Sequence, residues 1–494
     1  MLHKVLVANR GEIAVRVIRA CREMGIRTVA VYSDVDRTAM HVRMADEAFL
    51  IGTAAPSASY LRIERLVETA KRTGCEAVHP GYGFLSENAD FAQAVADAGL
   101  VFVGPPASVQ RSLGSKTEAR RIAASVGVPV AQGTMDPVTD VAAAREVCDR
   151  VGYPILLKPA GGGGGKGMRI VRAAEDLADA WRGATGEAQT AFGAPALLIE
   201  RYIEHGRHVE MQILADEAGE VRWLGERDCS VQRRHQKLIE ETPGPSVDDD
   251  LRARLADAAL RIARAARYVN AGTCEFLVAP DGTFVFLEVN TRLQVEHPVT
   301  ELATGLDLVA LQLRVAAGER LPFAQDEVVR HGAAIECRVT AEDARAGFLP
   351  AGGRVDLLRL PSGPGIRVDS ALELGTWVPD EYDPLIAKVV AHGRDRAEAL
   401  ARMRRALRET LVGGLPTSLP FHAHVLAEAD FVAGRYDTGY VGEHWPPPEP
   451  ELDDRQTIAA AIAAVLAARA THAHPAADPA RSPWAAAARA EALE

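Results

Sequence analysis

The first hundred residues alternate between short apolar runs and longer segments with helical spacing. Residues 4–8 form an apolar run of strand length, residues 12–24 place apolar side chains at helical spacing up to Gly25, and residues 28–32 are apolar again. This order predicts a strand, a helix and a parallel strand, the opening of a helix-covered sheet. The alternation continues to about residue 104, with helices expected at 60–71 and 88–98 and strands at 76–78 and 100–103.

The first predicted strand-to-helix turn reads Ala-Asn-Arg-Gly-Glu. A dinucleotide-binding turn carries three glycines, which serve the tight turn, the close approach of the pyrophosphate and the packing of the helix. This turn has one, Gly11. The pattern therefore favours a Rossmann-like layer without a dinucleotide site.

Glycine, proline and a change of composition divide the rest of the chain. A second unit begins near Ser115 and contains the glycine run at 158–167, and a third mixes short strands and turn sequences with one long helical pattern at 396–411. Proline-rich and then alanine-rich sequence follows, with a small helix expected at 457–470. We predict a multidomain protein of α/β and α+β type. Its expected domains are 1–114, 115–330, 331–441 and a tail at 442–494.

Composition agrees with an ordinary globular protein. The 494 residues suffice for about three domains at ~150 residues each, and 48% hydrophobic with 25% charged residues is typical of globular chains. The net charge of −11 argues against a nucleic-acid or membrane partner held by charge. Six scattered cysteines without a CxxC pair predict free thiols. With no apolar run of ~18 residues and no leader, the cytoplasm is the expected location.

The glycine run directly follows a predicted strand at 153–157. It reads Lys-Pro-Ala-Gly-Gly-Gly-Gly-Gly-Lys-Gly, so its backbone N–H groups are open to an anion and lysines flank it. This predicts a phosphate-binding loop, although the spacing differs from that of P-loop NTPases. A flexible linker is the alternative.

Residues 271–290 are expected to form a hairpin with Asp281-Gly282 as a two-residue turn. If Pro280 pairs with Thr283, Glu275 falls directly opposite Glu288. Two facing carboxylates repel each other, so a cation is expected between them, and oxygen ligands beside phosphates suit Mg²⁺ or Mn²⁺. The alternative is a solvent-facing pair that tolerates its repulsion.

Polar residues continue at alternate positions after Glu288, up to Glu296. Strand alternation would place them on one face, with Arg292 as an anion clamp and Glu296 as a candidate base. An exposed strand, or Glu296 as a structural partner of Arg292, are the alternatives. The basic segment 226–237 is interpreted as charge compensation for a polyphosphate, against the alternative of a solvated turn.

Several contiguous segments resemble one family. Segments 153–167 and 286–293 are similar to the two signature segments of the ATP-grasp carboxylases and carbamoyl-phosphate synthetases. Four more segments narrow the resemblance to biotin carboxylase, over roughly residues 1–442: VANRGEIA (7–14), HPGYGFLSEN (79–88), RDCSVQRRHQK (227–237) and NTRLQVEHPVTE (290–301). The resemblance implies a Rossmann-like N-terminal domain, an ATP-grasp domain with a mobile lid at about 131–203, and a C-terminal α+β domain.

The resemblance also implies a set of site residues. The residues that it assigns to ATP are Lys116, Lys158, Gly163, Gly164, Gly165, Glu200, Ile203, His208, Gln232, His235, Lys237, Leu277 and Glu288. Glu275, Glu288 and Asn290 would hold one or two divalent cations. Bicarbonate would be bound by Arg292, Gln294, Val295 and Glu296, and biotin by Tyr82 and Arg338. Glu296, Arg338, Arg292 and Lys237 would be catalytic.

The implied reaction uses ATP and bicarbonate to carboxylate biotin through carboxyphosphate, the first half-reaction of an acetyl-CoA or other acyl-CoA carboxylase, as in fatty acid biosynthesis. No biotinylation segment of the Ala-Met-Lys-Met type occurs, so biotin is expected on a separate carboxyl carrier protein. A carboxyltransferase partner and a homodimer are also implied. No acid, base or anion-binding cluster follows Glu443, so a chain cut after Gly442 is expected to stay active.

Two other functions stay open from the sequence. One is a different ATP-grasp ligase that forms carboxyphosphate, such as a carbamoyl-phosphate or purine-carboxylating enzyme. The other is a nucleotide-binding assembly protein without activity. Facing carboxylates at Glu275 and Glu288 argue against the latter, because a scaffold has no reason to maintain their repulsion.

Overall fold

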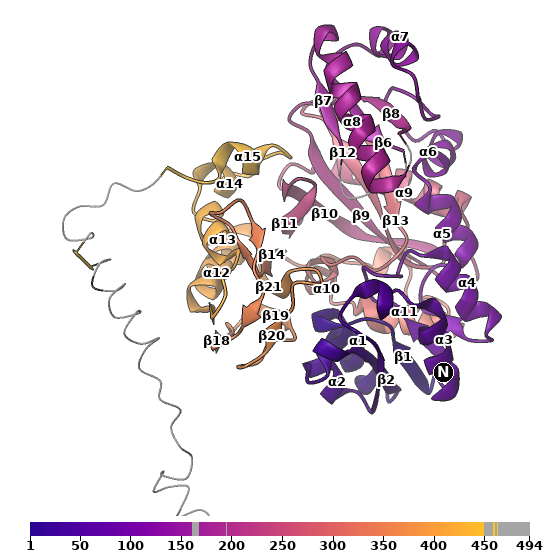
Figure 1. Ribbon diagram of the computed structural model, residues 1–494, viewed down its shortest axis with the longest axis vertical. Helices are drawn as coiled ribbons and strands as arrows, with labels where there is room; N and C mark the ends of the chain where they lie inside the picture. The colour runs from indigo at the N-terminus through magenta and orange to yellow at the C-terminus, as the bar shows by residue number, and fades with distance from the viewer. Residues whose placement is uncertain (161–166, 194, 449–457, 460–461, 463–494) are drawn as a thin grey trace, which may run out of the picture. The chain divides into compact units, whose positions relative to one another are not determined.

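The computed structural model describes residues 1–160, 167–193, 195–448, 458–459 and 462 (Figure 1). The chain divides into a unit at Met1–Trp445 and a second unit at Pro446–Glu494. Most of the tail helix expected at 457–470 lies outside the described residues, as do Gly163, Gly164 and Gly165.

The N-terminal part contains a five-stranded parallel sheet in the order β3-β2-β1-β4-β5. Its strands are β1 (Lys4–Val7), β2 (Arg27–Ser33), β3 (Glu47–Gly52), β4 (Ala77–His79) and β5 (Val101–Phe102). The helices of this region are α1 (Gly11–Glu23), α2 (Met40–Met44), α3 (Ile63–Arg72), α4 (Ala89–Asp97) and α5 (Ala107–Gly114). The strand, helix, strand opening is confirmed; β3 was not predicted.

Two short connections of this sheet bring chemistry-bearing residues together. The Asn9 amide donates hydrogen bonds of 2.7 Å to the carbonyls of Pro80 and Tyr82, so the loop after β4 is tied to the loop after β1. Because carboxyl ends of parallel strands share one edge of the sheet, Tyr82 and the start of α1 lie at that edge.

A small antiparallel sheet, β7-β6-β8, follows in the chain. It consists of β6 (Ile155–Pro159), β7 (Arg169–Val171) and β8 (Leu197–Arg201), and it is preceded by α6 (Lys116–Ser125). Helices α7 (Val141–Val151) and α8 (Leu177–Phe192) pack on it and share its apolar core (Figure 1). The expected strand before the glycine run is confirmed as β6.

The largest sheet has eight strands in the order β13-β12-β9-β10-β11-β14-β21-β19, and the labels of Figure 1 from β9 through β10, β11, β14 and β21 to β19 follow this order. These strands are β9 (Arg207–Ala215), β10 (Val221–Arg233), β11 (Gln236–Thr242), β12 (Asn270–Val278), β13 (Phe284–Asn290), β14 (Ala333–Thr340), β19 (Ile366–Ser370) and β21 (Leu385–Gly393). Since β11 pairs with β14, the sheet runs without a break across the expected boundary at 330. The division into 1–114, 115–330 and 331–441 stays a prediction.

Helices pack against this sheet along its length. They are α9 (Asp249–Ala265), α10 (His297–Thr304), α11 (Leu308–Ala316), α12 (Arg396–Glu409), α13 (Leu419–Val425), α14 (Ala429–Val432) and α15 (Tyr440–His444). Three small pairs complete the C-terminal region: β15 (Glu342–Asp343) with β16 (Leu349–Pro350), β17 (Gly353–Arg354) with β20 (Trp377–Val378), and β18 (Leu357–Arg359) with β22 (Leu411–Gly413). The helix expected at 396–411 is confirmed, and α15 spans the boundary expected at residue 442.

Two further expectations concern cysteines and membranes. All six cysteines are free, as their spacing predicted, and all six are buried. Among the described residues, no helix has the length and apolar character that a bilayer crossing needs.

Candidate active site

The β12–β13 hairpin places Glu275 directly opposite Glu288, as predicted. The turn itself differs from the prediction: the Ala279 N–H donates to the Thr283 carbonyl at 2.8 Å, so the loop has three residues and Gly282 takes a positive φ of 79°. A bulge between Glu275 and Phe276 then adds one residue on β13 and restores the register. The longer loop and the bulge each shift the register by one residue in opposite directions, so the pairing of the two carboxylates is the predicted one.

Four side chains bind the carboxylate of Glu275. Oε1 accepts from Lys237 Nζ at 2.8 Å, from Asn290 Nδ2 at 2.8 Å and from Gln294 Nε2 at 3.3 Å, and Oε2 lies 3.0 Å from His208 Nε2. Burial alone would raise the pKa of Glu275, but the Lys237 ammonium and His208 outweigh it and lower the pKa below its usual value. Glu275 is therefore held as a carboxylate.

Glu288 is in a different position. Its carboxylate accepts no hydrogen bond from any described residue, and burial followed by repulsion from Glu275 raises its pKa. Lys116 and Lys158 act in the opposite direction. A divalent cation bound by oxygen ligands would relieve both causes of the raised pKa, so Glu275 and Glu288 fit such an ion. The amide oxygen of Asn290 is engaged by Arg292 at 3.0 Å.

Lys237 is the centre of the carboxylate cluster. Its Nζ lies 2.5 Å from Glu210, 2.8 Å from Glu275 and 2.6 Å from Glu296. Burial lowers the pKa of this lysine, but the three carboxylates together raise it well above its usual value. The ammonium stays charged and holds three anionic groups around one point.

The backbone that leads to Glu296 differs from the predicted strand. Strand β13 ends at Asn290, and the chain turns through 291–296 so that Glu296 stands at the N-terminus of α10. The strand-alternation argument was therefore wrong for 291–296, although the side chain still reaches the cluster. Its Oε1 pairs with Lys237 at 2.6 Å and its Oε2 with Arg338 Nη2 at 2.9 Å. Burial would raise the pKa of Glu296, but Lys237, Arg338 and Arg227 lower it well below its usual value.

Arg292 makes other contacts than the suggested pairing with Glu296. Its guanidinium donates to Glu87 at 2.9 Å, to Asn290 at 3.0 Å and to Gln294 at 2.9 Å. These bonds fix the fork of Arg292 at the edge of the cluster. The described contacts thus give no support to the alternative in which Glu296 is a structural partner of Arg292.

The two residues assigned to biotin come from different parts of the fold, Arg338 from β14 and Tyr82 from the loop after β4. Arg338, on β14, donates through Nε to Glu240 at 2.5 Å in addition to its bond to Glu296. The phenol oxygen of Tyr82 is buried without a hydrogen-bond partner among the described residues. The Lys388 ammonium lies 5.5 Å from the centre of the Tyr82 ring.

Several of the residues assigned to ATP lie on strands β6, β8, β9, β10 and β12. Lys158 pairs with Glu200, which Arg120 also binds at 3.1 Å. His208 stands opposite Leu277 in the β9–β12 ladder, and Gln232 Nε2 lies 3.3 Å from His208 Nδ1. His235 takes a positive φ of 65° in the β10–β11 turn, and burial followed by Lys158, His208 and Lys116 lowers its pKa. Ile203 follows β8.

The segment 226–237 is only partly what was predicted. Two of its arginines bind other protein groups: Arg227 is fully buried among Glu210, Gln212 and Thr300, while Arg233 donates to the Gly347 carbonyl at 2.6 Å. Lys237 and Arg227 are cations of this segment that bind the carboxylate cluster, both through Glu210.

Sequence reasoning missed three acidic residues of the site. Glu210 binds Lys237 and Arg227, Glu240 binds Arg338, and Glu87 binds Arg292. His208, Glu210 and Glu275 could also together ligate a metal ion. Glutamates within apolar strands would have been the signal for Glu210 and Glu240, since an unpaired buried carboxylate is costly.

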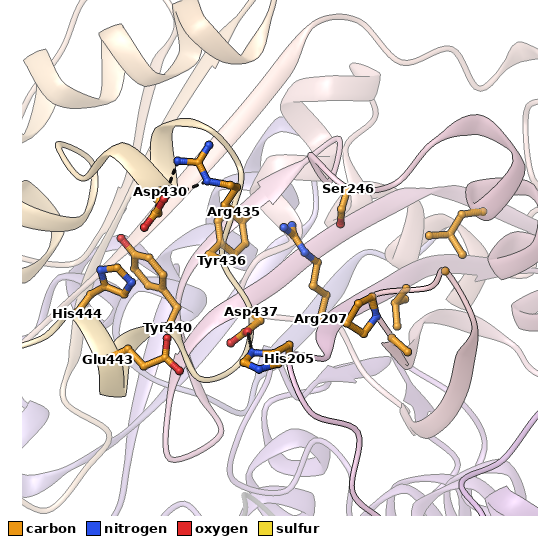
Figure 2. A pocket seen from close by; sticks show the side chains of 15 residues that line it. His205, Arg207, Ser246, Asp430, Arg435, Tyr436, Asp437, Tyr440, Glu443 and His444 are labelled. Carbon is orange, nitrogen blue, oxygen red and sulfur yellow. Dashed lines mark hydrogen bonds and ion pairs between the residues drawn. The ribbon is translucent and has the colours of Figure 1, made fainter.

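A cavity of about 590 Å³ lies elsewhere, at the turn end of β12 and beside α14 and α15 (Figure 2). Two pairs of its lining side chains bind one another, Arg435 with Asp430 at 2.7 Å and His205 with Asp437 at 2.8 Å, and Tyr440 stacks on His444. It does not include the carboxylate cluster.

Family models cover almost all of the first unit. Residues 1–109 match the biotin carboxylase N-terminal domain, 115–324 the ATP-binding domain of the carbamoyl-phosphate synthase L chain, and 336–443 the biotin carboxylase C-terminal domain.

Individual relatives agree with these models. Biotin carboxylase 1 of Bacillus subtilis is 48% identical over 89% of this chain and 98% of its own. A pyruvate carboxylase subunit from Methanothermobacter thermautotrophicus is 48% identical over 90% of each chain.

Two solved structures are similar over 90% of this chain. One is the biotin carboxylase of Campylobacter jejuni in a complex with a β,γ-ATP compound, with a TM-score of 0.87, 41% identity and 99% of that chain covered. The other is the biotin carboxylase domain dimer of Hydrogenobacter thermophilus 2-oxoglutarate carboxylase with MgADP and bicarbonate, with a TM-score of 0.87, 44% identity and 98% of that chain covered. The predicted fold class and enzyme class are confirmed, and the chain belongs to the biotin carboxylase family of ATP-grasp ligases.

Proposed function

We propose that this chain uses ATP and bicarbonate to carboxylate biotin attached to a separate carrier protein. The observation that carries the proposal is the position of Glu296. One of its oxygens binds Lys237, which lies beside the carboxylates that would hold the metal. The other oxygen binds Arg338, the residue assigned to biotin. A carboxylate at that point can serve a reaction that joins the nucleotide and biotin halves of the site.

The nucleotide half consists of the lysines and the polar residues assigned to ATP. Lys116 and Lys158 act electrostatically on Glu288, and with His208 they act on His235, so these groups share one region. Such cations favour the charge that develops during phosphoryl transfer. Glu275, Glu288 and Asn290 would hold Mg²⁺ or Mn²⁺, which supplies further neutralisation of phosphate charge when bound.

The bicarbonate step requires a base. In our proposal Glu296 removes the proton of bicarbonate, whose oxygen then attacks the γ-phosphorus while ADP leaves, giving carboxyphosphate. Arg292, Gln294 and the backbone of Val295 would hold the anion. Arg292 is already oriented by Glu87 and Asn290, so little ordering is needed when the anion binds.

The biotin step follows in the same space. Carboxyphosphate breaks to CO₂ and phosphate, the phosphate takes the ureido N–H proton, and that nitrogen bonds to CO₂. Arg338 would stabilise the ureido oxygen as it becomes negative, with its fork fixed by Glu240 and Glu296. Closure of the lid at about 131–203 would keep water from carboxyphosphate.

The partners follow from the half-reaction. We propose a biotin carboxyl carrier protein, a carboxyltransferase that receives the carboxyl group, and a homodimer of this chain in the cytoplasm. Relatives named for pyruvate and for 2-oxoglutarate show that the family serves several acceptors. Co-purification with a biotinylated protein and its carboxyltransferase would identify the acceptor of this one.

The direct test is ATP cleavage by the purified chain. We expect cleavage to require bicarbonate and to be stimulated by free biotin, with label from bicarbonate appearing in carboxybiotin. Stimulation by ammonia or by a purine substrate in place of biotin would favour another carboxyphosphate-forming ligase. Nucleotide binding without turnover would favour an assembly protein.

A further inference from the structure

Lys388, on β21, is a fully buried lysine that binds the bicarbonate turn. Its side chain has no exposed surface, and its Nζ donates a hydrogen bond of 2.8 Å to the carbonyl of Val295. Val295 lies between Gln294 and Glu296 in the turn that leads into α10. The ammonium thus contacts the backbone directly before Glu296.

The same ammonium has neighbours from the N-terminal and C-terminal parts of the chain. Glu12, in the first turn of α1, places Oε1 3.4 Å from it, and Asp369, on β19, places Oδ2 3.7 Å from it. Its nitrogen also lies 5.5 Å from the centre of the Tyr82 ring, within the range of a cation–π contact. One buried charge therefore connects α1, the loop after β4, the bicarbonate turn and the C-terminal strands.

Packing alone does not require a charge at this position. A buried ammonium loses its hydration, and an apolar side chain of similar volume is often equally or more stabilising. Glu12 has no hydrogen-bond partner for either oxygen among the described residues, and burial raises its pKa to about 7 although the Lys388 ammonium acts in the opposite direction. Lys388 hence donates its hydrogen bond to Val295 in a costly environment, which points to a role in orienting that turn.

We propose that Lys388 is a positioning residue for the bicarbonate and biotin half of the site. It fixes the Val295 carbonyl, and with it the direction of Glu296, and it sets the Tyr82 ring beside that turn. The proposal rests on the proposed function. It predicts that loss of Lys388 impairs bicarbonate use and biotin-dependent turnover and spares nucleotide binding, because the residues assigned to ATP do not contact it.

The test separates positioning from charge balance with three variants. Lys388→Met removes the ammonium and leaves Glu12 without its cation. Lys388→Met/Glu12→Gln removes both charges, so it should regain much of the thermal stability that the single variant loses. Glu12→Gln alone keeps the bond from Lys388 to Val295 and is the matched control.

For Lys388→Met/Glu12→Gln we expect KM for bicarbonate to rise and biotin-stimulated ATP cleavage to fall, each by ~10-fold for one lost charge-assisted hydrogen bond. ADP affinity should stay within ~2-fold of wild type, and Glu12→Gln should keep a bicarbonate KM near wild type. If the double variant regains both stability and a normal KM, or if Glu12→Gln alone shows the same defect, Lys388 has only a structural role. A wild-type chain without bicarbonate-dependent ATP cleavage would instead overturn the proposed function, and this role with it.

Discussion

The Lys237 ammonium lies 2.6 Å from the Glu296 carboxylate. This contact is the main favourable charge acting on Glu296, and together with Arg338 and Arg227 it holds the pKa of a fully buried carboxylate well below its usual value. A carboxylate with so low a pKa is a weak base. Bicarbonate, itself an anion, would compete for the same cations, so its arrival would raise the basicity of Glu296 at the moment a base is needed.

Replacing Lys237 with Met should move the pH dependence of the reaction. Glu296 must be ionised to act as a base, and loss of its nearest cation raises its pKa. The acid limb of kcat/KM for bicarbonate, measured at saturating ATP, should therefore shift to higher pH, with a lower rate throughout. Lys158→Met, which removes a lysine paired with Glu200 instead, should weaken ATP binding without that shift. An unchanged acid limb in Lys237→Met would exclude Glu296 as the titrating base.

Glu296→Ala should retain ATP binding and lose bicarbonate-dependent turnover by at least the ~10²-fold expected of a general base. Glu240→Gln is the matched control, since it also takes a carboxylate from Arg338 but leaves the base in place. We expect a smaller loss for Glu240→Gln, mainly in KM for biotin. Near-normal turnover by Glu296→Ala at neutral pH would remove Glu296 from the mechanism, and loss of ATP binding would indicate a structural role.

The hairpin shows how far local sequence rules reach. The Asp-Gly signal located the turn, and the pairing of Glu275 with Glu288 was predicted from it. The three-residue loop and the bulge beside Phe276 were not predicted, because both depend on how β13 twists against its neighbours. The prediction was right at the carboxylates because one shift cancelled the other.

Long-range pairing explains what was missed. Glu210 and Glu240 reach the cluster from β9 and β11, and only the strand order of the eight-stranded sheet brings these strands beside β12 and β14. Alternation along one segment carries no information on that order. Glu296 was selected for its spacing and its family motif, but the turn after Asn290 that brings it to Lys237 is set by packing of α10 against β10 and β14.

Glu288→Gln should raise the Mg²⁺ concentration needed for half-maximal activity and lower the maximal rate. The substitution removes one of two carboxylates that face each other across the hairpin and so weakens the attraction for a divalent cation. Titration of activity with Mg²⁺ and with Mn²⁺ measures the effect. Asp281→Asn, in the turn of the same hairpin, is the control and should leave the metal requirement as in wild type. An unchanged requirement in Glu288→Gln would contradict the metal assignment.

Glu336→Gln should make the protein less sensitive to alkaline pH. Glu336 is buried opposite Glu240, both its oxygens are without hydrogen-bond partners among the described residues, and burial raises its pKa well above the usual 4.5. The unfolded chain releases this proton near its ordinary pKa while the folded chain retains it. Each pH unit in that window therefore lowers the free energy of unfolding by up to about 1.4 kcal/mol.

Thermal unfolding between about pH 5.5 and pH 8.5 tests whether stability falls as the pH rises. The melting temperature of Glu336→Gln, relative to wild type, should rise as the pH rises. Glu220→Gln, at an exposed position, is the control for the loss of one negative charge. A difference that does not change with pH would mean that Glu336 is ionised in the folded protein.

Removal of the tail after Trp445 should leave biotin-dependent ATP cleavage near wild type. The cut after Gly442, which composition suggested, should instead lower the thermal stability of the chain. Trp445 belongs to the first unit: its indole N–H donates to the Ala344 carbonyl at 2.9 Å, and its ring packs edge-on against Phe421. Loss of a partly buried tryptophan and its hydrogen bond costs roughly 1–3 kcal/mol. The shorter chain should therefore melt at a lower temperature than the chain ending at Trp445, and Trp445→Ala in the full chain should reproduce most of that decrease. If the chain ending at Trp445 folds but loses its activity, residues beyond it contribute to the half-reaction, and the assignment of the tail as a dispensable linker is wrong.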